Sequence, residues 1–145
     1  MRRLALLALL LVPLVVAGCA SLGDETKNWT VEKLYTEAKE KLDGSVKFFF
    51  GNQETPKILT KLGTDVTNQK TNAVGKSDEK ACNWVFLSAL IQLEKRAKQL
   101  GANAVVNIVS YYKKDVMSSA TEFECHAGAV IAGVALKGDF VKVAE

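Results

Sequence analysis

Four residues of this 145-residue chain have side chains with distinctive chemistry: Cys19, Cys82, Cys125 and the single histidine, His126. A thiol can carry a lipid, form a disulfide, bind a metal or act as a nucleophile. One histidine and two distant cysteines match no zinc-binding pattern, so we expect no metal site. Which of the other roles each thiol has depends on the segments around it.

Cys19 follows a segment typical of a secretory signal. Two arginines open the chain, Leu4–Val16 is almost wholly apolar, and small residues directly precede the cysteine. The apolar stretch is shorter than the roughly 20 residues that a membrane-spanning helix needs. The pattern resembles a bacterial lipobox, which implies that Cys19 carries acyl chains such as palmitate and becomes the first mature residue. An ordinary signal peptide with a chance cysteine is the alternative.

The residue after Cys19 is Ala20, not the aspartate that retains lipoproteins at the inner membrane of enteric bacteria. We therefore expect the protein in the bacterial cell envelope, on the inner leaflet of the outer membrane and facing the periplasm. The formal charge of +3 falls to about +1 when Arg2 and Arg3 leave with the signal peptide. This near-neutral balance gives no electrostatic reason to bind nucleic acid. The expected partners are the membrane, through the lipid on Cys19, and an envelope protein.

Cys82 and Cys125 are the two cysteines that lipidation of Cys19 leaves over. In an oxidising compartment such thiols usually pair. A bond between them would close a loop of about 44 residues, worth about 4 kcal/mol on the chain-entropy model. The alternative is two buried free thiols. His126 adjoins Cys125, but neighbours on a strand point to opposite faces, so we expect an ordinary, partly exposed histidine rather than a Cys–His nucleophile.

Other catalytic and cofactor motifs are absent from the sequence. There is no GxxxxGK[ST] loop and no GxGxxG loop, so we expect no nucleotide. The acidic pairs Asp78–Glu79 and Glu122/Glu124 suit a helix start and an exposed strand face better than a glycosidase dyad. We expect no catalytic residues, no cofactor and no enzymatic activity.

Ser77–Leu100 is the clearest element, with a helical apolar period. Ser77 suits the N-cap and Gly101 suits the stop. Trp84 and its apolar neighbours widen the stripe, which predicts a first half buried on two sides. The stripe consists of Cys82, Phe86, Ala89, Leu93, Ala97 and Leu100.

The remaining pattern favours strands, and hence an α+β fold. We expect a small antiparallel-rich sheet packed against one long helix and preceded by a short N-terminal helix. A Cys82–Cys125 bond would then join helix to sheet. Lys57–Thr67 is either strand or irregular, and Asn68–Lys76 is expected to be a loop. The expected strands are Ser45–Phe50, Asn103–Tyr112, Thr121–Cys125, Ala129–Leu136 and a short edge at Phe140–Val143.

These elements define the expected domain organisation. Residues 1–18 form the lipoprotein signal peptide, and 19–28 form a polar, lipidated tether. Residues 29–43 form a short amphipathic helix that ends at Asp43–Gly44. Residues 44–145 form a single α+β domain.

From Ser45 onward the chain resembles a family of small exported bacterial proteins of unknown function. Members of that family often bear the label "excinuclease ATPase subunit". The absence of a nucleotide loop and of zinc cysteines, together with the export signal, argues against that activity here. The resemblance lies in Phe49–Gly51, Lys70–Ala73, Lys76–Trp84, Asn103–Ile108 and Ala132–Gly138.

Two shorter resemblances concern other segments. Trp29–Glu40 is similar to the first helical repeat of the outer-membrane assembly lipoprotein family BamD, but after Leu42 this chain turns to strands instead of further repeats. Ala97–Val109 resembles small α+β domains such as that of the stress-sensing lipoprotein of the Rcs system. The expected role is non-catalytic binding or structure. The alternatives are an envelope stress or redox sensor using Cys82 and Cys125, an assembly factor like BamD, and an uncharacterised enzyme.

Overall fold

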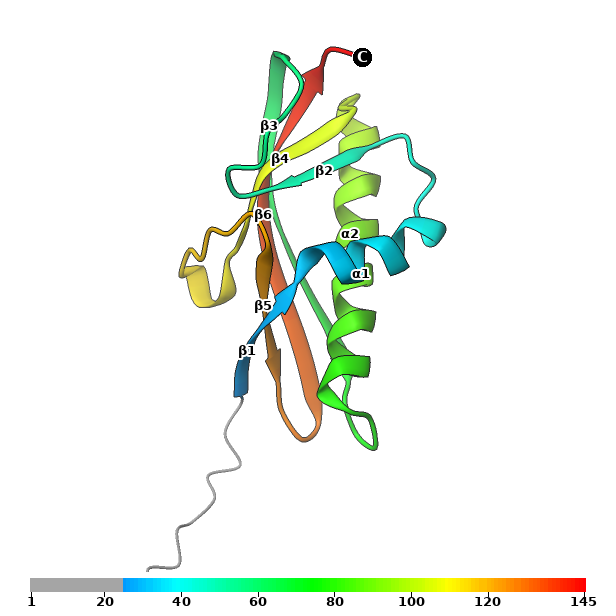
Figure 1. Ribbon diagram of the computed structural model, residues 1–145, viewed down its shortest axis with the longest axis vertical. Helices are drawn as coiled ribbons and strands as arrows, with labels where there is room; N and C mark the ends of the chain where they lie inside the picture. Colours follow the sequence, from blue (N-terminus) through cyan, green and yellow to red (C-terminus); the bar gives the residue numbers. More distant parts are fainter. Residues whose placement is uncertain (1–24) are drawn as a thin grey trace, which may run out of the picture.

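The computed structural model describes residues 25–145 and contains a six-stranded sheet with a long helix along one face (Figure 1). A short helix crosses the long one, and two brief 3₁₀ turns, η1 and η2, complete the fold. The elements in chain order are β1 (Glu25–Thr30), α1 (Val31–Ala38), η1 (Lys39–Lys41), β2 (Lys47–Phe50), β3 (Ile58–Asn72), α2 (Asp78–Leu100), β4 (Ala104–Ser110), η2 (Tyr112–Lys114), β5 (Glu122–Ala127) and β6 (Ile131–Val143).

β6 is the centre of the sheet. β3 pairs with one edge of β6 in antiparallel orientation along nearly its whole length. The other edge of β6 pairs first with β5, at Ala132 and Gly133, and then with β4, from Leu136 to Val141. β1 adds to β5 in antiparallel orientation, and β2 adds to β4 in parallel orientation. The predicted α+β class is confirmed, and the sheet is mixed because β2 and β4 run in the same direction.

α2 begins and ends where its capping residues predict. The Ser77 hydroxyl accepts a hydrogen bond from the Lys80 amide at 3.2 Å, which satisfies a donor of the first turn. Gly101 stops the helix in the left-handed region, at φ +74°, where a side chain would be strained. The predicted helix is therefore confirmed.

The core lies between α2 and the sheet. The Phe86 ring of α2 stacks on the Phe123 ring of β5, with centroids 4.1 Å apart. One turn earlier, Cys82 and Cys125 form a disulfide bond, with their Cα atoms 5.9 Å apart. The predicted pairing is confirmed, and it joins helix to sheet as expected. The largest fully buried side chains are Phe86, Phe123, Phe140, Leu90, Leu93, Ile108, Leu136, Val85, Val105, Val134 and Val141.

The three consecutive phenylalanines of β2 divide between the two faces of the sheet. Phe48 and Phe50 are buried in the main core beneath the helices. Phe49 points to the opposite face, where it packs against a small cluster that includes Val106 and Val143. The alternation follows from the two-residue period of a strand. Residues 47–50 therefore bury apolar surface on both sides.

β3 is longer than its composition suggests. Residues 68–72, predicted to be a loop, continue the strand and pair with residues 131–135 of β6. That prediction was wrong because these residues are polar. In an edge strand the outer side chains meet solvent, and the main-chain hydrogen bonds to β6 hold the strand regardless of side-chain polarity.

Phe140–Val143 was predicted to be a short edge strand, and this too was wrong. These residues continue β6 between β3 and β4. Polar residues near position 138 do not break the strand, because main-chain pairing with β3 on one edge and β4 on the other holds it. Asp139 also accepts a hydrogen bond from Thr64 of β3 at 2.6 Å. Gly138 also lets β4 come close, since a Cβ atom there would lie only 2.6 Å from Val105 Cγ1.

The segment before the domain differs from the predicted tether and helix. Residues 25–28, assigned to the 19–28 tether, belong to β1 and pair with β5. Trp29 also lies in β1, so α1 covers only Val31–Ala38 of the predicted 29–43 helix. A strand formed by pairing with residues 92 to 102 positions later leaves no local signal in its own sequence. Cys19 and the predicted signal peptide lie outside the described residues.

Candidate functional site

Both cysteines of the disulfide are fully buried between α2 and β5. Neither sulfur is a free thiolate, so this pair has no nucleophile to offer while the bond is intact. The bond holds the start of α2 against β5.

His126 is buried, with 7% of its surface exposed, which corrects the prediction of a partly exposed residue. The imidazole stacks on the Tyr112 ring, with centroids 3.3 Å apart, and its Nε2 lies 3.6 Å from a Glu124 carboxylate oxygen. Cys125 points the other way, into the core. As expected, the neighbouring Cys125 and His126 therefore do not form a catalytic pair. The burial depends on η2 folding over β5, which the sequence pattern does not reveal.

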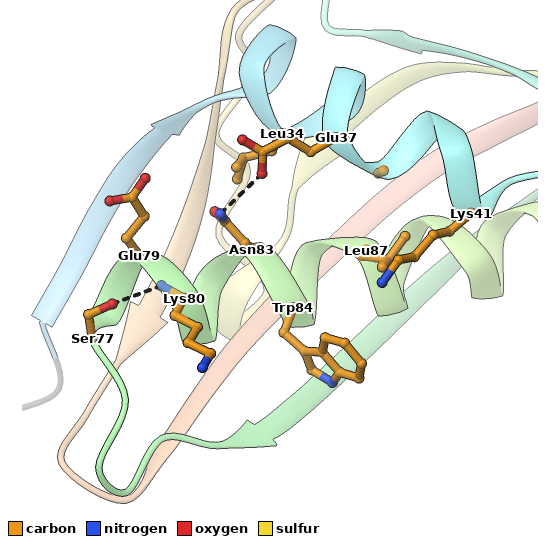
Figure 2. Close-up of a pocket in the computed structure, with 10 residues that line it drawn as sticks. Leu34, Glu37, Lys41, Ser77, Glu79, Lys80, Asn83, Trp84 and Leu87 are labelled. Carbon is orange, nitrogen blue, oxygen red and sulfur yellow. Dashed lines mark hydrogen bonds between the residues drawn. The ribbon is translucent and has the colours of Figure 1, made fainter.

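A groove of about 350 Å³ lies between α1 and α2 (Figure 2). Its apolar floor includes Leu34, Ala38 and Leu87. Polar and charged side chains from both helices line the rest, as do Ser77 and Trp84 near the start of α2. The other lining residues are Glu37, Lys41, Glu79, Lys80 and Asn83.

Two polar contacts hold α1 across α2 beside the groove. The Lys33 ammonium pairs with the Glu79 carboxylate at 2.7 Å. The Asn83 amide donates to the Glu37 carboxylate at 3.4 Å (Figure 2). The hydrogen bond with Glu79 and the charge of Glu79 raise the pKa of Lys33 above its usual value. Both pairs are exposed, so they place the helices relative to each other more than they stabilise the fold.

Trp84 is the most prominent residue of the groove. Trp84 is 56% exposed, whereas most of the apolar stripe of α2 is buried. The Lys41 ammonium lies 5.3 Å from the centroid of its ring, within cation–π range. Figure 2 shows the side chain projecting from α2, with Lys80 one turn earlier and Leu87 one turn later.

The exposure of Trp84 corrects the prediction that the first half of α2 is buried on two sides. The sequence did contain a signal for it. Trp84 lies two residues from Cys82 and from Phe86, which places it about 200° around the helix from either. It therefore falls outside the buried stripe. The prediction of a second buried face was wrong because it used the size and apolar character of this side chain instead of its position around the helix.

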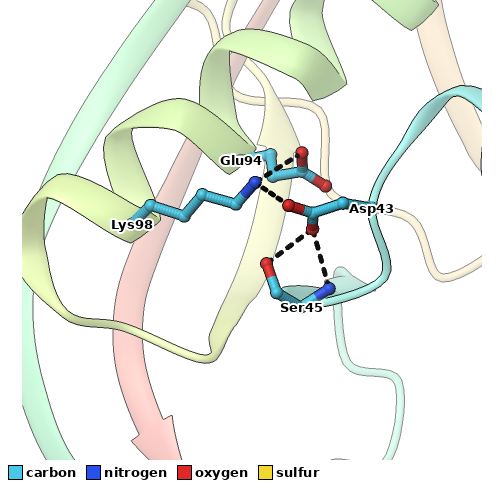
Figure 3. Close-up of polar contacts among 4 residues, drawn as sticks. All are labelled: Asp43, Ser45, Glu94 and Lys98. Atoms are coloured by element: carbon cyan, nitrogen blue, oxygen red, sulfur yellow. Dashed lines mark hydrogen bonds and ion pairs between the residues drawn. The ribbon is translucent and has the colours of Figure 1, made fainter.

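A second polar cluster lies near the end of α2 (Figure 3). The Lys98 ammonium donates to Asp43 and also contacts Glu94 at 3.2 Å. Asp43 also accepts from the Ser45 amide at 2.9 Å and from the Ser45 hydroxyl at 2.6 Å. The hydrogen bonds from Lys98 and then Ser45 hold the pKa of Asp43 well below its usual range. The bond to Asp43 raises the pKa of Lys98, so Lys98 stays protonated and is no nucleophile.

Glu94 and Tyr35 complete this cluster from the inner side. Glu94 is only 8% exposed, and its Oε2 atom has no hydrogen-bond partner among residues 25–145. Burial, and then the charge of Glu94, raise the pKa of Tyr35 above its usual value. At pH 7 the Tyr35 phenol is therefore neutral and the Lys98 amine is protonated, so neither is suited to act as a general base. The cluster connects the segment after α1 to α2.

Two general features apply to residues 25–145 as a whole. No helix there has both the length and the hydropathy needed to cross a bilayer. The same residues contain no group of three or more His, Cys, Asp or Glu side chains that could hold a metal ion.

Compared with known proteins, the chain matches no protein-family model and has no significant match among curated proteins. No relative therefore assigns a role to the groove. The resemblances drawn from the sequence motifs stay predictions.

Proposed function

We propose that this protein is a lipid-anchored envelope protein that docks another envelope protein without catalysing a reaction. The lipid on Cys19 would hold it at the inner leaflet of the outer membrane, facing the periplasm. The groove between α1 and α2 would be the docking surface. The exposed indole of Trp84 beside this groove is the observation that carries the proposal.

The surroundings of Trp84 indicate what kind of partner fits. Tryptophan is enriched among residues that dominate binding energy, because it buries a large area at little entropic cost. Leu34 and Leu87 offer an apolar floor beside it, while Lys41 and Lys80 lie on either side of the indole in the view of Figure 2. A polypeptide segment with an apolar anchor next to a carboxylate would complement this surface.

Burial of the disulfide bears on the redox-sensor alternative. A reductant reaches a disulfide by direct attack of a thiolate on sulfur, which needs access. Cys82 and Cys125 are both fully buried, so attack would require α2 to open away from β5. This burial favours a structural bond.

Site-specific crosslinking in intact cells tests the docking surface. A photoreactive phenylalanine analogue replaces Leu87 in the groove, and in a control protein it replaces Val116, an exposed residue of the β4–β5 loop. We expect one discrete envelope-protein adduct from position 87 and none from position 116. Adding Trp84→Ala, or Lys41→Glu with Lys80→Glu, should abolish it. Equal adducts from both positions, or no adduct, would contradict the proposal.

The anchor is tested in the same cells. Replacing Cys19 with Ala and adding a signal-peptidase-I site exports the domain without lipid. We expect mass spectrometry of the wild-type N-terminal peptide to show acyl groups on Cys19, and the adduct from position 87 to fall in the unanchored form. An unmodified Cys19 would refute the lipid anchor. The docking surface would still be tested separately by the crosslinking result.

A further inference from the structure

Three large aliphatic side chains are exposed at one end of the molecule. Val74 is 59% exposed, Val130 is 61% exposed and Ile131 is 53% exposed. Val74 lies in the turn between β3 and α2, and the other two lie where β5 turns into β6. We call these three residues the apolar tip. Figure 1 shows both turns at the same end of the domain.

Main-chain hydrogen bonds join the two turns of the apolar tip. The Ala73 amide donates to the Val130 carbonyl at 2.8 Å, and the Gly128 amide donates to the Ile131 carbonyl at 2.9 Å. Asn72 of β3 pairs with Ile131 of β6, directly below the turns. The tip is therefore a fixed surface held by the sheet, and its exposed side chains are presented together.

The chain enters the domain at this same end. Glu25, the first residue of β1, pairs with Ala127, which directly precedes the turn that holds Val130. Cys19 is six residues before Glu25 in the sequence. A fully extended chain spans at most about 3.6 Å per residue, so this linker reaches about 20 Å. A lipid on Cys19 would thus keep the apolar tip close to the membrane surface.

We infer that the apolar tip inserts into the headgroup region of the bilayer that holds the anchor. The inference rests on the proposed lipid anchor at Cys19. Transfer of exposed aliphatic side chains from water into the adjacent membrane lowers their free energy. Turns can present such side chains to a bilayer without a membrane-spanning segment. Lys70 and Lys76 flank the tip and would meet anionic headgroups. α2 starts at this end, and its long axis would then point away from the membrane (Figure 1).

This orientation has a consequence for the groove. Trp84 lies near the membrane-proximal start of α2, and the second polar cluster lies toward the distal end. A partner in the groove would approach from the side, within reach of the bilayer surface. A second envelope protein anchored in the same membrane fits this geometry.

A vesicle experiment with a single acyl chain tests the inference. The full mature chain, beginning at Cys19 and with Cys82–Cys125 oxidised, is coupled through the Cys19 thiol to a maleimide carrying one acyl chain. One chain gives only marginal, reversible membrane binding, so a contribution from the apolar tip is measurable. Partitioning is measured on phosphatidylethanolamine–phosphatidylglycerol vesicles, and thermal unfolding by circular dichroism confirms that each variant is folded.

We expect Val74→Asp with Val130→Asp to lower the partition coefficient about tenfold or more, because two aliphatic side chains that would enter the bilayer are replaced by charged ones. Val116→Asp is the matched control, since Val116 is 63% exposed but lies in the loop between β4 and β5. It should bind like the parent protein. Equal binding by the tip variant and the parent would overturn the inference, as would an equal loss in the control.

Two further measurements distinguish membrane insertion of the tip from self-association and from failed lipidation. Sedimentation without vesicles should show no self-association. A dimer that the tip variant dissociates would overturn the membrane assignment in favour of a second copy of the chain. The vesicle assay uses a synthetic acyl chain, so failure of the tip is distinguishable from failure of lipidation, which mass spectrometry of Cys19 from cells reports separately.

Discussion

The Lys98 ammonium donates a hydrogen bond to the Asp43 carboxylate, which connects the last turns of α2 to the segment between α1 and β2 (Figure 3). Both residues are exposed, so the pair is screened by water and contributes modestly to stability. It nevertheless fixes the position of the segment that follows α1 and leads into β2. The end of α1 beside the groove is thereby positioned as well.

The pair makes stability depend on pH in two directions. The pKa of Asp43 is lowered in the folded state, so its contribution is full above the unfolded value of about 3.8 and is lost as pH falls through the folded value. The pKa of Lys98 is raised, so its contribution is full below about 10.5 and is lost as pH rises through the folded value. Asp43→Asn should therefore cost more stability at pH 7 than at about pH 2.

Urea unfolding of the parent and of Asp43→Asn at both pH values measures this difference. Asp115→Asn, in the loop before β5, is the control for loss of one exposed carboxylate. A cost for Asp43→Asn that is the same at both pH values would show that its ionisation does not stabilise the fold.

The disulfide should be a major contributor to stability. Replacing Cys82 and Cys125 together with Ala is expected to lower the free energy of unfolding by about 2–5 kcal/mol, because the unfolded chain regains the freedom of the closed loop. Urea denaturation compares the variant with the oxidised and the reduced parent. If the reduced parent unfolds at the same urea concentration as the oxidised one, the bond contributes nothing to stability.

Gly138 is required for the close approach of β6 and β4. Gly138→Ala should destabilise the protein by about 1–3 kcal/mol, because the new Cβ would collide with Val105. Gly133→Ala in the same strand is the control, since its Cβ would lie 3.6 Å from the nearest atom, Gln69 O. Thermal unfolding compares the two variants, and equal unfolding midpoints for Gly138→Ala and Gly133→Ala would contradict the role of Gly138.

Trp84 should matter little for folding. Trp84→Ala is expected to change the free energy of unfolding by less than about 1 kcal/mol, as for most exposed positions. Replacement by Ala of Leu90, which is fully buried in α2, should lower the free energy of unfolding by about 2–5 kcal/mol. Chemical denaturation of the two variants tests the contrast. A large loss at Trp84 would mean that the indole serves packing instead of a binding surface.

Some of the structure could be predicted because its signals are local. Ser77 and Gly101 mark the ends of α2, and the apolar period between them marks its buried face. Because the chain is expected to be exported, its two remaining cysteines predict a disulfide bond from the chemistry of the oxidising compartment. Phe48 and Phe50 could be assigned to a strand, because β-propensity and alternation act within a few residues.

Other features escaped prediction because their causes lie elsewhere in the chain. β1 and the second half of β3 are polar segments that become strands only because β5 and β6 offer unpaired main-chain groups. The continuity of β6 through Asp139 depends on main-chain pairing with β3 and β4, which are distant from it in the sequence.

Caps, helical periodicity and thiol count are properties of short segments or of composition. They were enough to predict the α+β class, the long capped helix and the Cys82–Cys125 pairing. Tertiary packing alone buries His126 against Tyr112 and leaves Trp84 exposed beside a groove. It also brings Val74 and Val130 to the end of the domain where β1 starts. These are relations between segments brought together by strand pairing and helix packing. Burial and proximity are set by what lies opposite a side chain in space, which its sequence neighbours do not specify.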